Sequence, residues 1–86
     1  MKLEFYGTYK SFSVKKTKTD KDYIELICNE QMNNKDVKIC VFGNKFLENL
    51  KLFNDGDGIV IIFSYWYDKK SKNNVLIVKD IISVDG

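Results

Sequence analysis

The sequence predicts an all-β domain in which five strands curl into a barrel, with one short helix between the third and fourth strands. Two observations support this prediction. Short runs of β-branched and aromatic residues alternate with polar ones along most of the chain, which is the period of half-buried strands. Residues 46–53 instead space their apolar side chains at helical intervals. The 86 residues suffice for a single domain over residues 1–86 and are too few for two.

The first two strands are predicted over residues 2–14 and 23–28, with a lysine-rich loop between them. Gly7 interrupts the first apolar pattern, and a glycine inside a strand pattern indicates a bulge or a sharp bend. In the second strand, alternation puts the apolar residues of one face inside, namely Ile24, Leu26 and Cys28. Tyr23 then faces outward from the same strand.

The third strand is predicted over residues 37–42, and Gly43 ends it. One of its faces carries Val37, Ile39 and Val41, and the other carries Lys38, Cys40 and Phe42. Asn44 is the expected N-cap of the helix. The helix has an apolar face made of Phe46, Leu47, Leu50 and Phe53. Residues 54–58 (Asn-Asp-Gly-Asp-Gly) supply the turn chemistry that ends it.

The fourth strand, residues 59–67, is the strongest strand signal because nearly every residue in it is β-branched or aromatic. Such a run tends to aggregate when it is exposed at a sheet edge, so we expect it to be paired on both sides. The fifth strand, residues 75–84, should kink at Lys79–Asp80, where its apolar pattern breaks. The order of three strands, one helix and two strands is that of a five-stranded OB-fold barrel.

Two cysteines and no histidine limit the chemistry that the chain can perform. Alternation places Cys28 on the inner face and Cys40 on the outer face, so we expect no disulfide between them. Two cysteines without histidine do not make a zinc site, and we expect no metal or other cofactor. Because no Ser-His or Cys-His pair can form, we expect neither catalytic residues nor enzymatic activity.

The longest unbroken apolar run, residues 59–63, is far too short to cross a bilayer, and the N-terminus lacks the apolar stretch of a secretory signal. We therefore expect a cytoplasmic protein without a membrane partner. All 14 basic residues are lysine, which suits phosphates, whereas arginine most often reads guanine edges. The absence of arginine disfavours a sequence-specific reader of duplex DNA, although a genome of low GC content would also favour lysine.

Three motifs follow one another in the middle of the chain: Ile-Cys-Val-Phe-Gly at 39–43, Phe-Leu-x-x-Leu at 46–50 and Gly-Asp-x-Ile-x-Ile at 56–61. This ordered set resembles single-stranded-DNA-binding proteins of the bacterial and phage type. The resemblance covers residues 38–63 and is topological elsewhere. It implies that Phe42 stacks on DNA bases. It also implies that the barrel interior holds Val37, Ile39, Val41, Ile59 and Ile61.

The chain ends Ser-Val-Asp-Gly and lacks the acidic C-terminal tail that recruits partners in cellular members of that family. A compact protein from a phage or a mobile element therefore fits the sequence better than a full cellular one.

An OB binding face needs flat aromatic rings for bases and cations for phosphates. The aromatic residues predicted to face outward, or to stand at a twisted strand end, are Phe42, Trp66, Tyr23 and Tyr67. Trp66 faces out if the four residues of opposite parity on its strand face the core, namely Ile59, Ile61, Phe63 and Tyr65. Contact with a protein partner or with a second copy of the chain would explain the same exposure.

Lysines complete the predicted nucleic-acid-binding site, namely Lys38, Lys69, Lys70, Lys72, Lys16 and Lys18. Lys38 shares the outer face of its strand with Phe42, and the others lie in or beside the loops at 15–22 and 68–74. Taken singly, each lysine is expected to be ordinary solvated surface. Two lysine clusters that flank aromatic residues together favour a binding site.

The predicted function is sequence-nonspecific binding of single-stranded DNA in replication, recombination or DNA protection. A preference for RNA and a homo-oligomeric state stay open. Because a fold does not determine function, the alternative is an OB-fold accessory subunit that binds a replicative polymerase or primase. In that case Trp66 and Tyr67 would be interface anchors.

Overall fold

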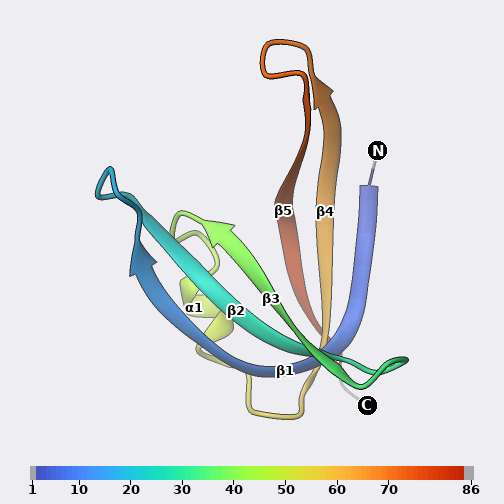
Figure 1. Ribbon diagram of the computed structural model, residues 1–86. Coiled ribbons are helices and arrows are strands. Elements are labelled where there is room, and N and C mark those ends of the chain that lie inside the picture. Colours follow the sequence, from blue (N-terminus) through green and yellow to red (C-terminus); the bar gives the residue numbers. More distant parts are fainter. Residues whose placement is uncertain (1, 85–86) are drawn as a thin grey trace.

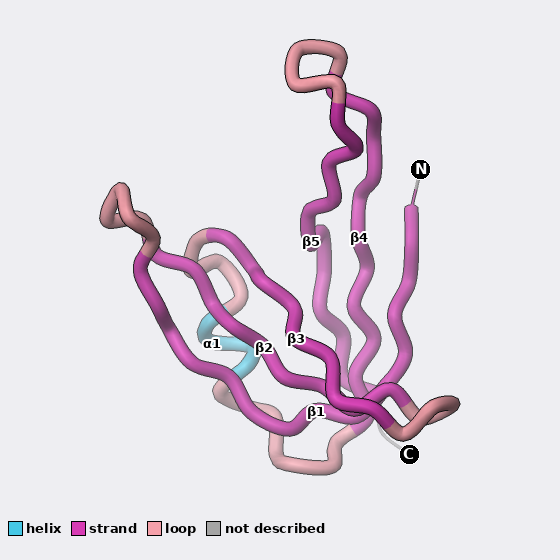
Figure 2. Tube along the Cα trace, viewed as in Figure 1, coloured by secondary structure: helices cyan, strands magenta, loops and turns pink. Residues whose placement is uncertain are grey.

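The computed structural model describes residues 2–84, which form one five-stranded antiparallel sheet and a single helical turn (Figures 1 and 2). In chain order the elements are β1 (Lys2–Lys16), β2 (Asp22–Glu30), β3 (Lys35–Phe42), α1 (Leu47–Leu50), β4 (Gly58–Asp68) and β5 (Asn73–Val84). The strand order across the sheet is β3-β2-β1-β4-β5. The predicted all-β class, the five strands and the position of the helix are confirmed.

β1 joins the two halves of the sheet. Residues 2–8 pair with β4, and residues 8–16 pair with β2. Figure 1 shows β1 curving through the base of the molecule, from which the β4–β5 hairpin rises on one side and the strands β2 and β3 on the other. The pairing expected on both sides of β4 is confirmed, because β1 and β5 are its neighbours. β3 and β5 are the two edges of the curled sheet.

The irregularity expected in β1 lies near Gly7 rather than at it. The register shift in the β1–β2 pairing falls between Tyr9 and Ser11, so Lys10 is the bulged residue. A Cβ at position 7 would overlap the backbone carbonyl oxygen of Asn29. Gly7 therefore allows a close backbone approach. Of the bulge or sharp bend expected at this residue, the bulge lies three residues further along, at Lys10.

The kink expected in β5 is confirmed. Ile62 pairs with Asp80 and the next residue, Phe63, pairs with Val78, which leaves Lys79 as an extra residue on β5. A bulge of this kind bends its strand and increases the local twist.

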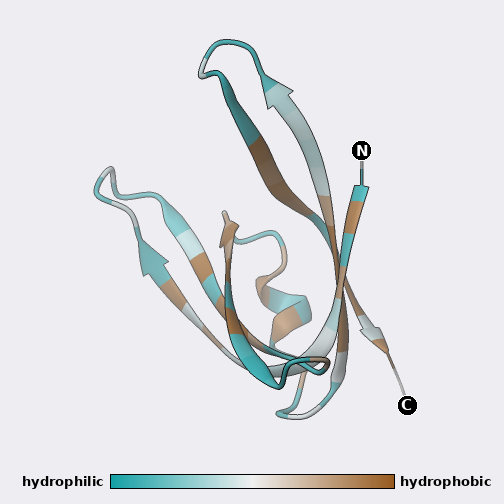
Figure 3. Cartoon of the chain, turned by 45° about the vertical axis from the view of Figure 1, so that its right-hand side comes forward, coloured by the Kyte–Doolittle hydropathy of each residue, from teal (hydrophilic) through white to brown (hydrophobic). Residues whose placement is uncertain are grey.

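Burial confirms the predicted alternation. The fully buried side chains of the sheet include Ile24, Leu26, Cys28, Val41, Ile59 and Ile61. Val37 and Ile39 face the same way and pack against this core, but they are only partly buried because β3 is an edge strand. The core is completed by Tyr9, Phe46, Leu50 and Ile81. The apolar inner face of the sheet thus holds the fold together, and Figure 3 shows hydrophobic bands along the strands.

α1 differs from the predicted helix in length and in its cap. It begins at Leu47, its N-cap residue is Phe46, and no side chain caps it, so the prediction that Asn44 is the N-cap is wrong. The predicted apolar face is right, because Phe46 and Leu50 are buried and Phe53 packs against the core. A helix this short depends on tertiary packing rather than on its own propensity, and packing sets its length.

The turn predicted after the helix is confirmed. The carboxylate of Asp57 accepts a hydrogen bond of 2.8 Å from the backbone N–H of Asn54, and Gly56 has a φ of 96°. The turn is tied to β1, since the Gly56 N–H donates to the Tyr9 carbonyl and the Tyr9 N–H donates to the Asp57 carbonyl, both at 2.8 Å. These bonds lie on the β4 side of β1, where they continue the β1–β4 pairing next to the bulge at Lys10.

Both cysteines are free, as predicted. Cys28 is buried and Cys40 is exposed on the other face of the sheet. Burial raises the pKa of the Cys28 thiol to about 11. Across residues 2–84 no three His, Cys, Asp or Glu side chains gather as a set of metal ligands. That same stretch has no helix of the length and apolar character needed to cross a membrane.

Candidate nucleic-acid interface

Two aromatic rings lie side by side on the outer face of the sheet. Tyr23 on β2 and Phe42 on β3 are directly opposite each other in the strand register. Their ring centroids are 6.3 Å apart, and the ring planes are inclined by 43°. Phe42 is 71% exposed, and Tyr23 is half-buried. We call these two residues the aromatic pair. Such a pair offers flat apolar surface to a ligand that can stack.

An open depression of about 350 Å³ lies beside the aromatic pair. It is lined by Lys16, Thr17, Lys18, Tyr23, Cys40 and Phe42. Four of the predicted site residues therefore meet here, because the loop between β1 and β2 lies against the end of β3. Rings and ammonium groups occur together in this depression, as binding of bases and phosphates requires.

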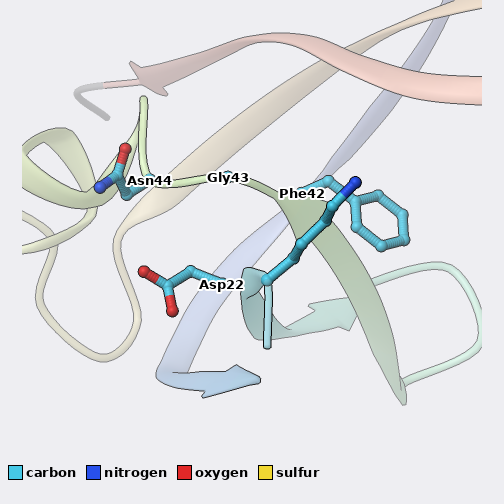
Figure 4. A pocket seen from close by; sticks show the side chains of 5 residues that line it. Asp22, Phe42, Gly43 and Asn44 are labelled. Atoms are coloured by element: carbon cyan, nitrogen blue, oxygen red, sulfur yellow. The ribbon is translucent and has the colours of Figure 1, made fainter. Parts of the chain in front are cut away.

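A second depression, of about 310 Å³, lies where β3 ends (Figure 4). Its lining includes Asp22, Phe42, Gly43 and Asn44. Gly43 has a φ of 83° and its N–H donates a 3.0 Å hydrogen bond to the Asp22 carbonyl. The chain turns away at this glycine, as predicted. The ring of Phe42 thus borders open space in both depressions.

The predicted lysines differ in whether a carboxylate already neutralises them. Lys38 lies 3.6 Å from Glu25, and Lys16 lies 3.4 Å from Asp20 and 3.9 Å from Asp22. Among the described residues, no ion pair involves the four loop lysines, namely Lys18, Lys69, Lys70 and Lys72. Among the predicted site lysines that the structure describes, those without an ion pair are thus the lysines of the two hairpin loops.

Trp66 and Tyr67 lie near the tip of the β4–β5 hairpin, which projects from the base of the molecule (Figure 1). Trp66 is 44% exposed and is opposite in parity to the buried residues Ile59 and Ile61, as predicted. Tyr67 is 56% exposed, but it faces the other side of the hairpin. The structure therefore separates these two aromatics instead of joining them in one platform.

The loop that follows them, residues 69–72, is organised by one carboxylate. The side chain of Asp68 accepts a 3.0 Å hydrogen bond from the backbone N–H of Lys70 and a 3.1 Å bond from the hydroxyl of Ser71. Asp68 is engaged in the turn, and among the described residues the lysines of this loop form no ion pair with it or with another carboxylate. The tip of the hairpin is accordingly hydrophilic (Figure 3).

Phe42 borders the β4–β5 hairpin across the gap between the edge strands β3 and β5. A cavity of about 200 Å³ in this gap is lined by Cys40, Val41, Phe42, Ile77 and Val78. Ile77 is exposed and lies on the same face of the hairpin as Trp66, because Ser64 pairs with Ile77 and Trp66 pairs with Val75. The face that carries Phe42 thus adjoins the face that carries Trp66, and Tyr67 lies apart from both.

Sequence reasoning did not select Glu25 or Ile77 for this surface. The alternation of β2 did place Glu25 on the outer face with Tyr23, so a signal existed. Its two lysine partners come from neighbouring strands, and which residues are neighbours depends on the register. In the sequence, Ile77 is an ordinary strand residue. Its place on this surface follows from the position of β5 next to β3 in the structure.

Neither a protein-family model nor a curated protein matches this sequence. Among solved structures, the chain is similar to the mitochondrial single-stranded DNA-binding protein Rim1 of S. cerevisiae. The match covers 98% of this chain and 95% of that chain, with a TM-score of 0.68 and 16% sequence identity. At this identity the likeness is one of fold. The predicted OB fold, and the resemblance in fold to single-stranded-DNA-binding proteins, are confirmed and extend over nearly the whole chain.

Proposed function

We propose that this protein binds single-stranded DNA without sequence preference. The observation that carries the proposal is the exposed ring of Phe42, paired with Tyr23 and bordered by the lysines of the β1–β2 loop. Stacking on aromatic side chains tolerates every base, because each base has a π-face. The likeness in fold to a single-stranded DNA-binding protein supports the same conclusion.

In this proposal the strand follows the outer face from the β1–β2 loop to the β4–β5 hairpin. Bases stack on Phe42 and Trp66, with Tyr23 supporting the first of these rings. Phosphates bind at Lys18 and at the lysines of residues 69–72, whose ammonium groups are not neutralised by a carboxylate. Lys16 and Lys38 contribute less, because each already has an acidic partner.

The role we assign is binding alone, in replication, recombination or DNA protection, within the cytoplasm of a cell that carries a phage or mobile element. Protection and presentation of a single strand need no reaction on it. RNA is the alternative strand, since stacking and phosphate contacts do not by themselves distinguish the two.

Trp66 is the only tryptophan and provides the test. Titration with oligo-dT should quench its fluorescence, because a base stacked on the indole changes the environment of the ring. Calorimetry of the same titration measures the affinity independently of the fluorophore. Absence of heat and of quenching at high protein and DNA concentration would refute the proposal.

The alternative, an accessory subunit of a replication complex, is favoured by the apolar residues exposed on both faces of the hairpin. Trp66 and Ile77 lie on one face, and Tyr67 and Leu76 lie on the other. Large aromatic side chains of this kind are common anchors of protein interfaces. If Trp66→Ala leaves DNA affinity unchanged but abolishes co-purification of a replication protein, this second role is the correct one.

A further inference from the structure

One carboxylate lies among the cations of the outer face. Glu25 on β2 stands between Ser13 of β1 and Cys40 of β3, in the row next to the aromatic pair. Its Oε2 lies 3.1 Å from the Nζ of Lys15, and its Oε1 lies 3.6 Å from the Nζ of Lys38. Each oxygen of the carboxylate thus binds a lysine from a different neighbouring strand.

Glu25 is held in place more firmly than its partners. Its side chain is 16% exposed, whereas both lysine side chains are much more exposed. The hydrogen bond from Lys15 and the charges of Lys15 and Lys38 lower the pKa of Glu25, so the carboxylate is ionised at neutral pH. The ammonium groups can therefore turn toward a ligand, but the negative charge stays on the sheet.

Lys15 and Lys38 have no second acidic partner among the residues that the structure describes. Without Glu25 they would be two free cations on the outer face. Lys15 lies beside Tyr23 in the row of the aromatic pair, and Lys38 lies two rows further along β3, within reach of the phosphates of a strand that stacks on Phe42. With Glu25 present, one of their two positive charges is neutralised, and an approaching phosphate meets a like charge.

We propose that Lys15 and Lys38 form a phosphate subsite for which Glu25 is the built-in competitor. This inference rests on the proposed function and deepens it. A phosphodiester oxygen replaces a carboxylate oxygen at each ammonium group, so the exchange adds little affinity. Glu25 thereby limits the affinity of the outer face and leaves most of the salt-dependent binding to the loop lysines.

Replacing Glu25 by glutamine tests the proposal, because the amide keeps the shape of the side chain and removes its charge. Glu25→Gln should bind oligo-dT about tenfold more tightly at low salt. The slope of log affinity against log salt should become more negative by about 0.7–1.4, the contribution of one to two phosphates of a single strand. Glu25→Ala offers a second neutral replacement, and a thermal melt checks that each variant is folded.

The matched control is Glu48→Gln. Glu48 lies on α1 and makes an exposed ion pair of 3.2 Å with Lys51, so its replacement removes the same charge from another exposed ion pair, away from the outer face of the sheet. A general change in net charge would affect both variants alike. A larger gain in affinity and a steeper salt slope for Glu25→Gln support the proposal. Equal values for the two variants, or weaker binding by Glu25→Gln, would overturn it.

Replacement of the two lysines provides a second test of the proposal. Replacing Lys15 and Lys38 together by glutamine should change the salt slope little in the wild-type background. In the Glu25→Gln background the same pair of changes should restore the wild-type slope. If the lysine changes weaken binding equally in both backgrounds, Glu25 does not mask them.

A phosphate compound that contains no nucleic acid separates this inference from the proposed function. Tripolyphosphate should shift the side-chain NMR signals of Lys15 and Lys38 in Glu25→Gln and much less in the wild type. This result supports the masked subsite even if the wild type binds no oligonucleotide, in which case only the proposed function fails. No shift in either protein would overturn the subsite.

Discussion

Phe42 and Ile61 lie on opposite faces of the sheet and have opposite solvent exposure. Phe42 is largely exposed next to Tyr23, whereas Ile61 is completely buried between neighbouring strands. An exposed ring can contribute to binding without supporting the core, and a buried aliphatic side chain does the reverse. Alternation along each strand separates these two tasks at the scale of single residues.

Phe42→Ala should weaken binding of single-stranded DNA by about 1–3 kcal/mol, the usual contribution of one stacked base. The melting temperature should change little, because loss of an exposed ring leaves no core cavity. Titration calorimetry and a thermal melt measure the two effects. An unfolded Phe42→Ala variant would show that the ring is structural.

Ile61→Ala is the complementary variant. It should lower the free energy of unfolding by about 2–5 kcal/mol, since it removes buried methyl groups and leaves a cavity. The folded fraction should keep its DNA affinity. Denaturant unfolding and binding measured on the same sample test this, and a normal stability would contradict the assignment of Ile61 to the core.

The two cysteines should differ in reactivity toward a thiol reagent. Burial raises the pKa of Cys28 to about 11, so its reactive thiolate is scarce at neutral pH, whereas Cys40 is exposed. We expect Cys40 to react in the native protein and Cys28 only after unfolding or at strongly alkaline pH. Bound oligo-dT should slow the reaction of Cys40, which lines the depression beside Phe42. Equal reactivity of both thiols would contradict the strand parity.

At the scale of elements, β1 shows what pattern reading captures and what it misses. The apolar alternation located the strand, but the bulge at Lys10 is visible only in the register of β1 against β2, and the hydrogen bonds beside it join Tyr9 to the turn at residues 54–57. Partners so far apart in the chain leave no local signal. The helix is similar, since its apolar positions were predictable, whereas its single-turn length is set by packing against the core.

Gly7→Ala tests the close approach of the backbone in β1. The added Cβ would overlap the Asn29 carbonyl oxygen, which is backbone and has little room to move. We expect a loss of about 1–3 kcal/mol in the free energy of unfolding, typical of overpacking. Gly56→Ala is the comparison. An added Cβ at Gly56 meets no other atom, so the cost there comes only from the positive φ, which alanine rarely adopts. If Gly7→Ala has wild-type stability, β1 does not approach β2 as described.

At the scale of the whole molecule, the curled sheet brings together surfaces that are distant in the sequence. The predicted aromatic and lysine residues were recognisable from parity and loop position. That Ile77 borders the same cavity as Phe42 depends on how β5 lies against β3, whereas the separation of Tyr67 from Trp66 follows from alternation along β4. The neutralised state of Lys38 likewise depends on strand register, which composition does not encode.

Charge at this scale predicts the salt dependence of binding. If the four unpaired loop lysines contact phosphates, log affinity should fall with log salt at a slope of about −2 to −3. Replacing Lys69, Lys70 and Lys72 together by glutamine should make the slope less steep by about 2. Fluorescence titrations across a range of salt concentrations measure both values, and a flat dependence in the wild type would mean that the lysines are ordinary surface.

If the outer face binds single strands through Phe42 and Trp66, binding should not depend on their base sequence. Equilibrium titration of the wild type and of a Phe42→Ala/Trp66→Ala variant tests this. The ligands are unstructured single strands of different sequence, the corresponding RNA, and duplex DNA. We predict similar affinities for the single-stranded DNAs, weaker binding of duplex, and a large loss for the variant with its fold intact. Equal or tighter binding of duplex, or unchanged binding by the folded variant, would contradict the account.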